Sequence, residues 1–314
     1  MKFNSFAKKK MLFEGLVSLH SKSVHQLFVS WHMVLRLIRP MNTYVSANPQ
    51  LVNVSTIARL CVEHFVEEII NVFGDKYLRR PTPADLQRLL YIGGQRGFPG
   101  MIGSIDCMHW EWKNCPTAWK GQYSRSSEKP TIVLEAVASY YLWIWHTFFG
   151  PPEYHLAYYL TDGIYPKWAI FIQSIPIPQG PKAVLFAQRQ EAVRKDVERA
   201  FGVLQARFAI VKNPALFGDK VKIGKIMRAC IILHNMIVED ERDGYTQFDV
   251  SEFQQGEDNG SSHVDLMYST DIPTNIANMM GVRTRIRDRQ MHQQLKDDLV
   301  EHVWLKFGRV EDNN

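Results

Sequence analysis

Three carboxylates in the sequence could together cleave a phosphodiester bond. Asp106 stands in the run MIGSIDCMHWEW, Asp162 ends the run LAYYLTD, and Glu198 lies within a helical pattern. Two divalent ions held by carboxylates, about 3.5–4 Å apart, can activate a water and stabilise the leaving oxygen. Magnesium favours oxygen ligands and keeps several waters, so few acidic side chains are required. Acids from two strands and one helix therefore suit metal-dependent hydrolysis.

Each acid also has a structural interpretation. An aspartate in a strand is often only hydrogen-bonded, and an aspartate before a glycine, as at Asp162, is common in turns. Glu198 is spaced to pair with Arg194 one helical turn earlier. Glu198 also borders an apolar stripe, however, and is therefore expected at the edge of a buried face.

Hydrophobic periodicity predicts the elements that would position these acids. Helical spacing predicts helices over 55–73 and after Pro83. Strand-like patterns over 101–112, 130–141 and 142–150 predict three strands, and 156–166 predicts a fourth. Further helices are predicted over 223–238 and in the C-terminal segment. One long helix, from a Pro-rich stretch to about Val211, is predicted by a stripe of apolar residues: Val193, Val197, Phe201, Leu204 and Phe208.

The distribution of charge is more informative than its total. The chain has 314 residues and a net charge of +5. Residues 243–274 contain seven acidic residues and no Lys or Arg, so the rest of the chain carries about +12. Four cysteines without a CxxC pair favour a reducing compartment. No segment is predicted to span a membrane, so we expect an intracellular protein.

Several other side chains are candidates for contacts or ligands. Exposed aromatic rings could stack on unpaired bases and basic residues could contact phosphates, although core packing and solvated surface charges are the alternatives. The aromatic candidates are Trp110, Trp112 and Trp119. The basic candidates are Lys113, Lys120, Arg125, Arg194, Arg199 and Arg207. A zinc site is a further interpretation, with burial in the core as its alternative. Its ligands would be Cys107, His109, Cys230 and His234.

Several blocks of sequence resemble plant transposon proteins of the PIF/Harbinger superfamily, which are DDE transposases and transposase-derived nucleases. The resemblance runs from about Ser55 to the C-terminus. The blocks that carry it are GFPGMIGSIDCMHWEWKNCPTAWKGQY, KPTIVLEAVAS, YYLTDGIYP, RKDVERAFGVLQARFAIV, ACIILHNMIVEDE and RDRQMHQQLKDDLVEHVWLKFG.

This resemblance implies a fold, a site and partners. The implied fold is α/β, an RNase H-like mixed sheet with flanking helices, a helical N-terminal region and a C-terminal helix. By motif, Asp106, Asp162 and Glu198 are the catalytic and metal-binding triad, and Mg²⁺ or Mn²⁺ is the cofactor. DNA is the implied substrate, a Myb/SANT-like protein from the same element is an implied partner, and the nucleus is the implied location. A homo-oligomer stays open.

The sequence departs from the family pattern in two places. The family carries a longer segment with a helix between the third and fourth strands, whereas Gly150 to Leu156 is only seven residues long. A parallel crossover usually needs about a dozen residues. We therefore expect a missing crossover helix, and either an uncovered sheet face or a rearranged core in which Asp162 does not reach Asp106. The first fifty residues do not match the helical DNA-contacting region of the family.

These observations predict five regions and leave two functions open. The regions are an atypical N-terminal segment (1–54), a helical region (55–97), a catalytic core shortened at 150–156 (98–240), an acidic flexible segment (241–274) and a C-terminal helical segment (275–314). The first function is a metal-dependent endonuclease acting on DNA, impaired or active. The second is a non-catalytic relic or a domesticated module that binds DNA or protein.

Overall fold

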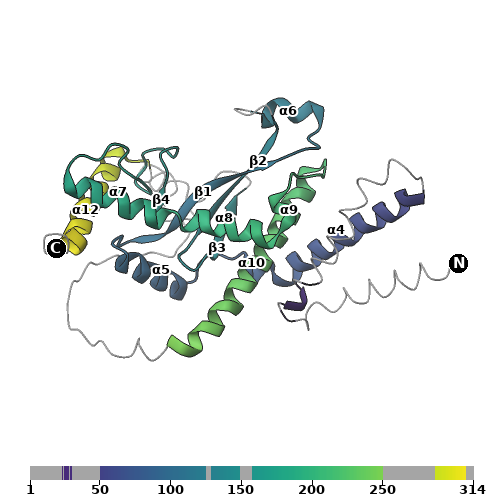
Figure 1. The fold of residues 1–314 in the computed structure, drawn as a ribbon, viewed down its shortest axis with the longest axis horizontal. Helices are drawn as coiled ribbons and strands as arrows, with labels where there is room; N and C mark the ends of the chain where they lie inside the picture. The colour runs from purple at the N-terminus through teal and green to yellow at the C-terminus, as the bar shows by residue number, and fades with distance from the viewer. Residues whose placement is uncertain are drawn as a thin grey trace, which may run out of the picture. The chain divides into compact units, whose positions relative to one another are not determined.

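A computed structural model describes residues 23, 25–27, 29, 50–124, 129–148, 158–249 and 287–308 of the chain (Figure 1). The chain divides into two compact units, each built from separate segments. The first unit contains residues 1–79, 109–133 and 202–244, and the second contains 80–108, 134–201 and 245–314. Most of the predicted N-terminal segment, and the acidic segment beyond Asp249, lie outside the described residues.

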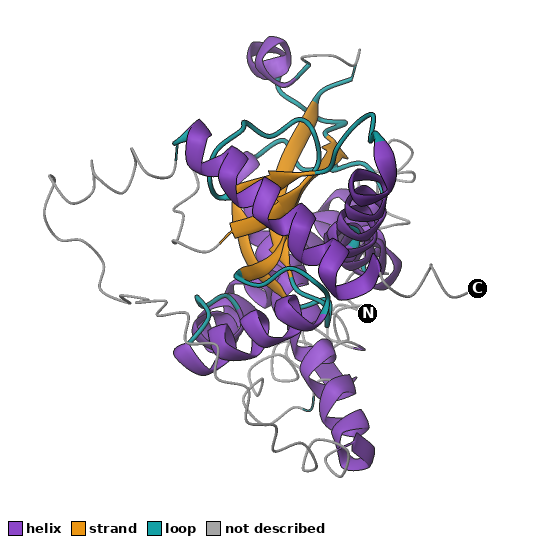
Figure 2. Ribbon diagram, turned by 90° about the vertical axis from the view of Figure 1, so that its left-hand side faces the viewer, coloured by secondary structure: helices purple, strands orange, loops and turns teal. Residues whose placement is uncertain are grey.

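Five strands form one mixed sheet in the order β3-β2-β1-β4-β5 (Figure 2). They are β1 (Met101–Glu111), β2 (Thr131–Ala138), β3 (Ile144–Phe148), β4 (Tyr158–Thr161) and β5 (Phe171–Gln173). β2 and β3 pair in antiparallel fashion, whereas β4 pairs in parallel with both β1 and β5. The predicted mixed sheet with flanking helices is therefore confirmed. The sequence prediction missed β5, because three residues are too few to show a period.

The pairing of β4 with β1 corrects one expectation. The short link after the third strand predicted either an uncovered face or a rearranged core. The fourth strand does lie beside the first, so a rearrangement that removes β4 from β1 is wrong. The link itself, and with it the predicted absence of a crossover helix, lies outside the described residues.

The central position of β1 depends on close packing against β2. A Cβ atom added at Gly103 would lie 2.9 Å from the carbonyl oxygen of Ala138, which is closer than real side chains allow. Every residue of β4 and β5 is buried, as is usual for parallel strands covered on both faces. The strand ends that carry Asp106 and precede Asp162 are thus held by tightly packed neighbouring strands.

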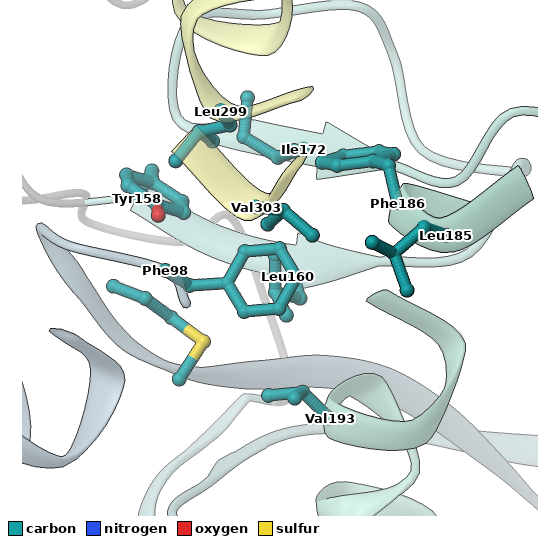
Figure 3. Packing of buried hydrophobic residues seen from close by; sticks show 10 residues of the cluster. Phe98, Tyr158, Leu160, Ile172, Leu185, Phe186, Val193, Leu299 and Val303 are labelled. Carbon is teal, nitrogen blue, oxygen red and sulfur yellow. The ribbon is translucent and has the colours of Figure 1, made fainter. Parts of the chain in front are cut away.

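Helices of the second unit complete its core. They include α5 (Pro83–Gln95), α7 (Gly180–Arg194) and α12 (Arg289–Phe307). A capping box between Thr82 and Asp85 begins α5, which satisfies backbone N–H groups that the first helical turn leaves unpaired. α12, the predicted C-terminal helix, packs against α7. The buried cluster between them and the strands (Figure 3) contains Phe98, Met101, Tyr158, Leu160, Ile172, Leu185, Phe186, Val193, Leu299 and Val303.

The predicted long helix that ends near Val211 is in fact three helices. α7 ends at Arg194, α8 spans Asp196–Arg207, and a short α9 spans Ala209–Lys212. Lys195, with φ −62° and ψ −3°, separates the first two. All five residues of the predicted stripe are nevertheless buried. The apolar stripe stays buried on both sides of the break at Lys195. The sequence pattern therefore does not reveal the break.

The first unit is organised by two long helices. α4 (Gln50–Tyr77) covers the predicted helix 55–73, and α10 (Lys220–Asp249) continues past the predicted end at Val238. The side-chain amide of Asn235 donates to the carbonyl of Tyr77 at 2.9 Å, and Lys225 forms an ion pair with Glu67 at 2.7 Å. Among the helices that the structure describes, none has the length and apolar character needed to cross a membrane.

Candidate functional site

Asp106 lies on β1, and Asp162 directly follows the neighbouring parallel strand β4, both in the second unit. In the pairing of β1 with β4, Gly103 is opposite Tyr159 and Ser104 is opposite Leu160. The same register, continued two residues past the Ser104–Leu160 pair and so one residue past the end of β4, sets Asp106 level with Asp162. Neighbouring strands lie about 4.8 Å apart, and the charge of Asp162 acts on Asp106, which agrees with this register. The two aspartates are therefore brought together.

The environment of Asp106 makes its negative charge unfavourable. Its side chain is 16% exposed, and its Oδ1 accepts a hydrogen bond from the backbone N–H of Cys107 at 2.7 Å. Burial raises the pKa of Asp106 and the charges of Asp162 and Glu198 raise it further, whereas the N–H of Cys107 and the charge of Arg194 oppose the shift. The charge of Asp106 thus interacts with those of both other acids. Such a cluster is stabilised by a bound cation, which relieves the repulsion.

Asp162 is held by its own turn and by a helix behind the strand. Its Oδ1 accepts a hydrogen bond from the backbone N–H of Ile164 at 3.1 Å, so the turn interpretation of Asp162 is confirmed. Gln190 of α7 is fully buried, and its Nε2 donates to the carbonyls of Thr161 at 2.9 Å and Ile172 at 3.0 Å. Gln190 therefore joins the last residue of β4, immediately before Asp162, to the middle residue of β5.

Glu198 reaches the same region through Arg194. Nη1 of Arg194 lies 2.6 Å from Oε1 of Glu198 and 3.7 Å from Oδ2 of Asp106, and Nη2 lies 2.8 Å from Oε1 of Glu191. The predicted pairing of Glu198 with Arg194 is confirmed. Burial acts to lower the pKa of Arg194, but the hydrogen bonds and charges of the two glutamates raise it above its ordinary value. The guanidinium therefore stays charged among the carboxylates.

The three carboxylates are the type of ligand that a divalent metal prefers, but the guanidinium of Arg194 lies between two of them. Carboxylate oxygens are the ligands that Mg²⁺ and Mn²⁺ prefer. In the described part of the chain, no three His, Cys, Asp or Glu side chains are grouped to hold a metal ion. Nη1 of Arg194 instead contacts both Asp106 and Glu198. A positive group already bridges two of the three acids, so a metal ion would compete with it.

The candidate contact residues divide by burial and pairing. Trp110 and Trp112 are buried, and their indole N–H groups each donate to a backbone carbonyl at 2.7 Å, so both belong to the core. Trp119 is 41% exposed and stays a candidate for stacking. The remaining candidates are basic. Arg194, Arg199 and Arg207 form ion pairs, Lys113 and Lys120 are exposed, and Arg125 lies outside the described residues.

The zinc interpretation gains no support from the surroundings of its cysteines. Cys230 and His234 are fully buried in α10, and burial raises the pKa of the Cys230 thiol well above its ordinary value. Sγ of Cys107 lies 3.3 Å from the hydroxyl of Tyr165, and burial raises the pKa of this thiol too. Because zinc binds the thiolate, both cysteines are better described as packed thiols.

Two positioning groups were missed by the sequence interpretation. Gln190 is a polar residue between Phe186 and Val193, at helical spacing within an apolar face, and this interruption is a signal that the sequence does carry. Ser104 is buried, and its hydroxyl donates to the carbonyl of Val193 at 3.1 Å. This contact fixes α7 against β1 two residues before Asp106.

A sequence profile of plant transposon proteins matches the chain over residues 75–153 and 151–245. The matched region contains β1 to β5, α5, and α7 to α9, and therefore all three acids. The two matched segments meet at residues 151–153, within the link between β3 and β4. Comparisons with curated proteins and with solved structures gave no match.

Proposed function

Because the chain belongs to the family of plant transposon proteins, we propose that it is a transposase-derived endonuclease that cleaves DNA phosphodiesters with divalent metal ions. Within that family we assign it to the PIF/Harbinger superfamily. Asp106, Asp162 and Glu198 are its proposed catalytic and metal-binding residues, with Mg²⁺ or Mn²⁺ as the ion.

The observation that carries this proposal is the register of β1 against β4, which sets Asp106 level with Asp162. The sheet order β3-β2-β1-β4-β5, with the last two strands parallel to β1 and an antiparallel β2–β3 pair, is the arrangement expected of an RNase H-like fold. A helix then supplies Glu198, as the DDE pattern requires. These features support metal-dependent cleavage of DNA at the ends of β1 and β4.

Each residue has a distinct role in the proposed site. Asp106 and Asp162 would hold the metal ions and Glu198 would complete the ligand set. The ions supply an activated water and a stabilised leaving oxygen. Gln190 fixes the strand end that precedes Asp162. Arg194 orients Glu198 toward Asp106 and balances charge while the metal is absent.

Cleavage of duplex DNA by the full chain tests the proposal. Supercoiled plasmid should be nicked in Mg²⁺ or Mn²⁺ but not in EDTA. Asp106→Asn keeps the side-chain shape and should reduce the rate at least a hundredfold. Asp297→Asn, at an exposed position of α12, is the matched control and should keep the wild-type rate. Cleavage that survives Asp106→Asn would exclude this site as its source.

A non-catalytic module that binds DNA is the second candidate function. The observations that favour it are the guanidinium of Arg194 among the acids and the meeting of the two matched segments at 151–153, where the family segment between the third and fourth strands is expected. Binding of DNA without any metal-dependent cleavage would support this function.

The superfamily assignment carries two further proposals. A Myb/SANT-like protein encoded by the same element is the proposed partner, and the nucleus is the proposed location. Co-expression of the two proteins, followed by affinity purification of this chain, would recover the partner if the assignment is right.

A further inference from the structure

A hollow of about 480 Å³ in the second unit begins at the candidate site. Its lining residues are Arg96, Tyr140, Ala192, Lys195, Glu198 and Arg199. Glu198 belongs to both the hollow and the proposed triad. Three cationic side chains and one aromatic ring therefore line this space. Among the described lining residues, Glu198 is the only acid.

A buried carboxylate fixes the two arginines of this hollow. The side chain of Asp196 is 2% exposed and forms ion pairs with both Arg96 and Arg199. Nη2 of Arg96 lies 3.2 Å from Oδ1 of Asp196. One carboxylate balances only one of the two guanidinium charges, while Lys195 at the rim lies 3.5 Å from Oε1 of Glu191. Three cations and the carboxylate of Glu198 therefore line the hollow, with the two arginines anchored on Asp196.

Tyr140 adds an exposed aromatic surface to the same walls. It lies in the turn between β2 and β3 and is 46% exposed. The guanidinium carbon of Arg96 lies 4.9 Å from the centre of its ring, and that of Arg199 lies 6.0 Å away. Both distances fit cation–π contacts. An exposed ring held beside fixed cations combines the two features by which proteins bind single-stranded nucleic acid.

We propose that this hollow binds one unpaired nucleotide of the DNA strand beside the cleaved phosphate. Its base stacks on Tyr140, and its phosphate contacts Lys195 and Arg199. This inference rests on the proposed function for the identity of DNA as the partner and for the position of the cleaved phosphate. It adds a preference for DNA with unpaired nucleotides, since a base must leave its stack to reach the ring.

Binding can be separated from cleavage by using the full chain with Asp106→Asn and no divalent metal. Fluorescence anisotropy would measure its affinity for three DNA hairpins: one blunt, one with a three-thymidine overhang and one with a three-residue abasic overhang. The thymidine overhang should bind more tightly than the abasic one, which carries the same phosphates without bases.

Two substitutions at Tyr140 then test the role of the ring. Tyr140→Ala should weaken binding of the thymidine overhang by about 5- to 100-fold and bring it to the affinity of the abasic overhang, whereas Tyr140→Phe should keep the preference. Lys195→Ala should weaken both overhangs equally. Lys182→Ala, on the same helix as Ala192 but outside the hollow, should change neither.

Equal affinity for thymidine and abasic overhangs, or an unchanged preference in Tyr140→Ala, would overturn the inference. Displacement of the DNA by poly-glutamate, with no preference among the three hairpins, would assign the hollow to acidic protein segments instead. Neither result would bear on plasmid cleavage, so failure of this inference and failure of the proposed function are distinguishable.

Discussion

Arg194 and Glu198 are joined across a break between two helices, with Nη1 of the arginine 2.6 Å from Oε1 of the glutamate. Arg194 is the last residue of α7, and Glu198 lies in the first turn of α8. The pair ties α8 to the residue that also faces Asp106 on β1. The direction of Glu198 therefore depends on a group that the DDE pattern does not include.

Removal of Arg194 should weaken the fold and strengthen metal binding. Arg194→Met keeps an aliphatic stem but loses the contacts with Glu191, Glu198 and Asp106. Both glutamates are more than 40% exposed, so solvent screening limits the loss of unfolding free energy to about 1–2 kcal/mol. Without the competing guanidinium, Mn²⁺ should raise the melting temperature of the variant more than that of the wild type. A smaller rise would mean that Arg194 helps to assemble the metal site.

The pH dependence of the unfolding free energy should show the cost of ionising the half-buried carboxyl of Asp106. Its pKa is raised in the folded state, so ionised Asp106 opposes folding at neutral pH. This cost disappears as the pH falls through the raised pKa and below the ordinary carboxyl pKa. Asp106→Asn, which cannot ionise, should therefore be more stable than the wild type at pH 7. The difference should shrink on acidification.

Urea denaturation at several pH values measures this difference. Asp297→Asn provides the control, because its side chain is exposed and the change should leave the stability nearly constant. If Asp106→Asn is less stable than the wild type at pH 7, the contact of Asp106 with Arg194 outweighs the cost of burial.

Gln190 should matter for both stability and activity. Gln190→Leu keeps the volume but removes the donor to the carbonyls of Thr161 and Ile172. Two buried acceptors without a donor should cost about 2–4 kcal/mol of unfolding free energy. Cleavage per folded molecule should also fall, because Asp162 directly follows Thr161. Gln293→Leu, on the exposed face of α12, should cost less than about 0.5 kcal/mol. Loss of stability with unchanged cleavage would confine Gln190 to a structural role.

The two arginines around Asp196 should contribute unequally. The side chain of Arg96 is 21% exposed and that of Arg199 is 53% exposed, whereas Asp196 is buried. Arg96→Met should cost about 2–4 kcal/mol, because it leaves a buried carboxylate poorly compensated. Arg199→Met should cost less than about 1 kcal/mol. In an Asp196→Asn background the cost of Arg96→Met should become much smaller, and a double-mutant cycle measures this coupling. If Arg96→Met costs as much in this background as in the wild type, Arg96 stabilises the fold through its contact with Tyr140 and not through its ion pair with Asp196.

The sequence indicated the elements that carry the site, because their patterns are local. Alternation around Asp106 predicted β1, and the run before Asp162 predicted β4. Glu198 was expected beside a buried stripe, and that stripe is buried. What could not be predicted depends on distant contacts. The register that sets Asp106 level with Asp162 follows from packing between strands about fifty residues apart.

Other features escaped prediction for different physical reasons. The break at Lys195 changes the backbone of one residue while the side chains on both sides stay buried, so the hydrophobic pattern passes through it. Arg194 was a candidate for phosphate contact, with a solvated surface charge as the alternative, and its pairing with Glu198 was predicted from the helical spacing and is confirmed. Its contact with Asp106 of β1 was not predicted, because it can be recognised only once the strand and the helix are assembled.

The packing of α12 affects when the proposed nuclease acquires its shape during synthesis. Leu299 and Val303 share one core with Phe98, Leu160 and Ile172. Ribosomes release chains from the N-terminus onward, so the strands emerge well before the helix that covers their apolar side chains. Until about residue 307 has been translated, Leu160 and Ile172 lack part of their cover. Messages cut short before α12 should therefore yield aggregation-prone fragments, and competence to bind DNA should arise only after this helix has left the exit tunnel.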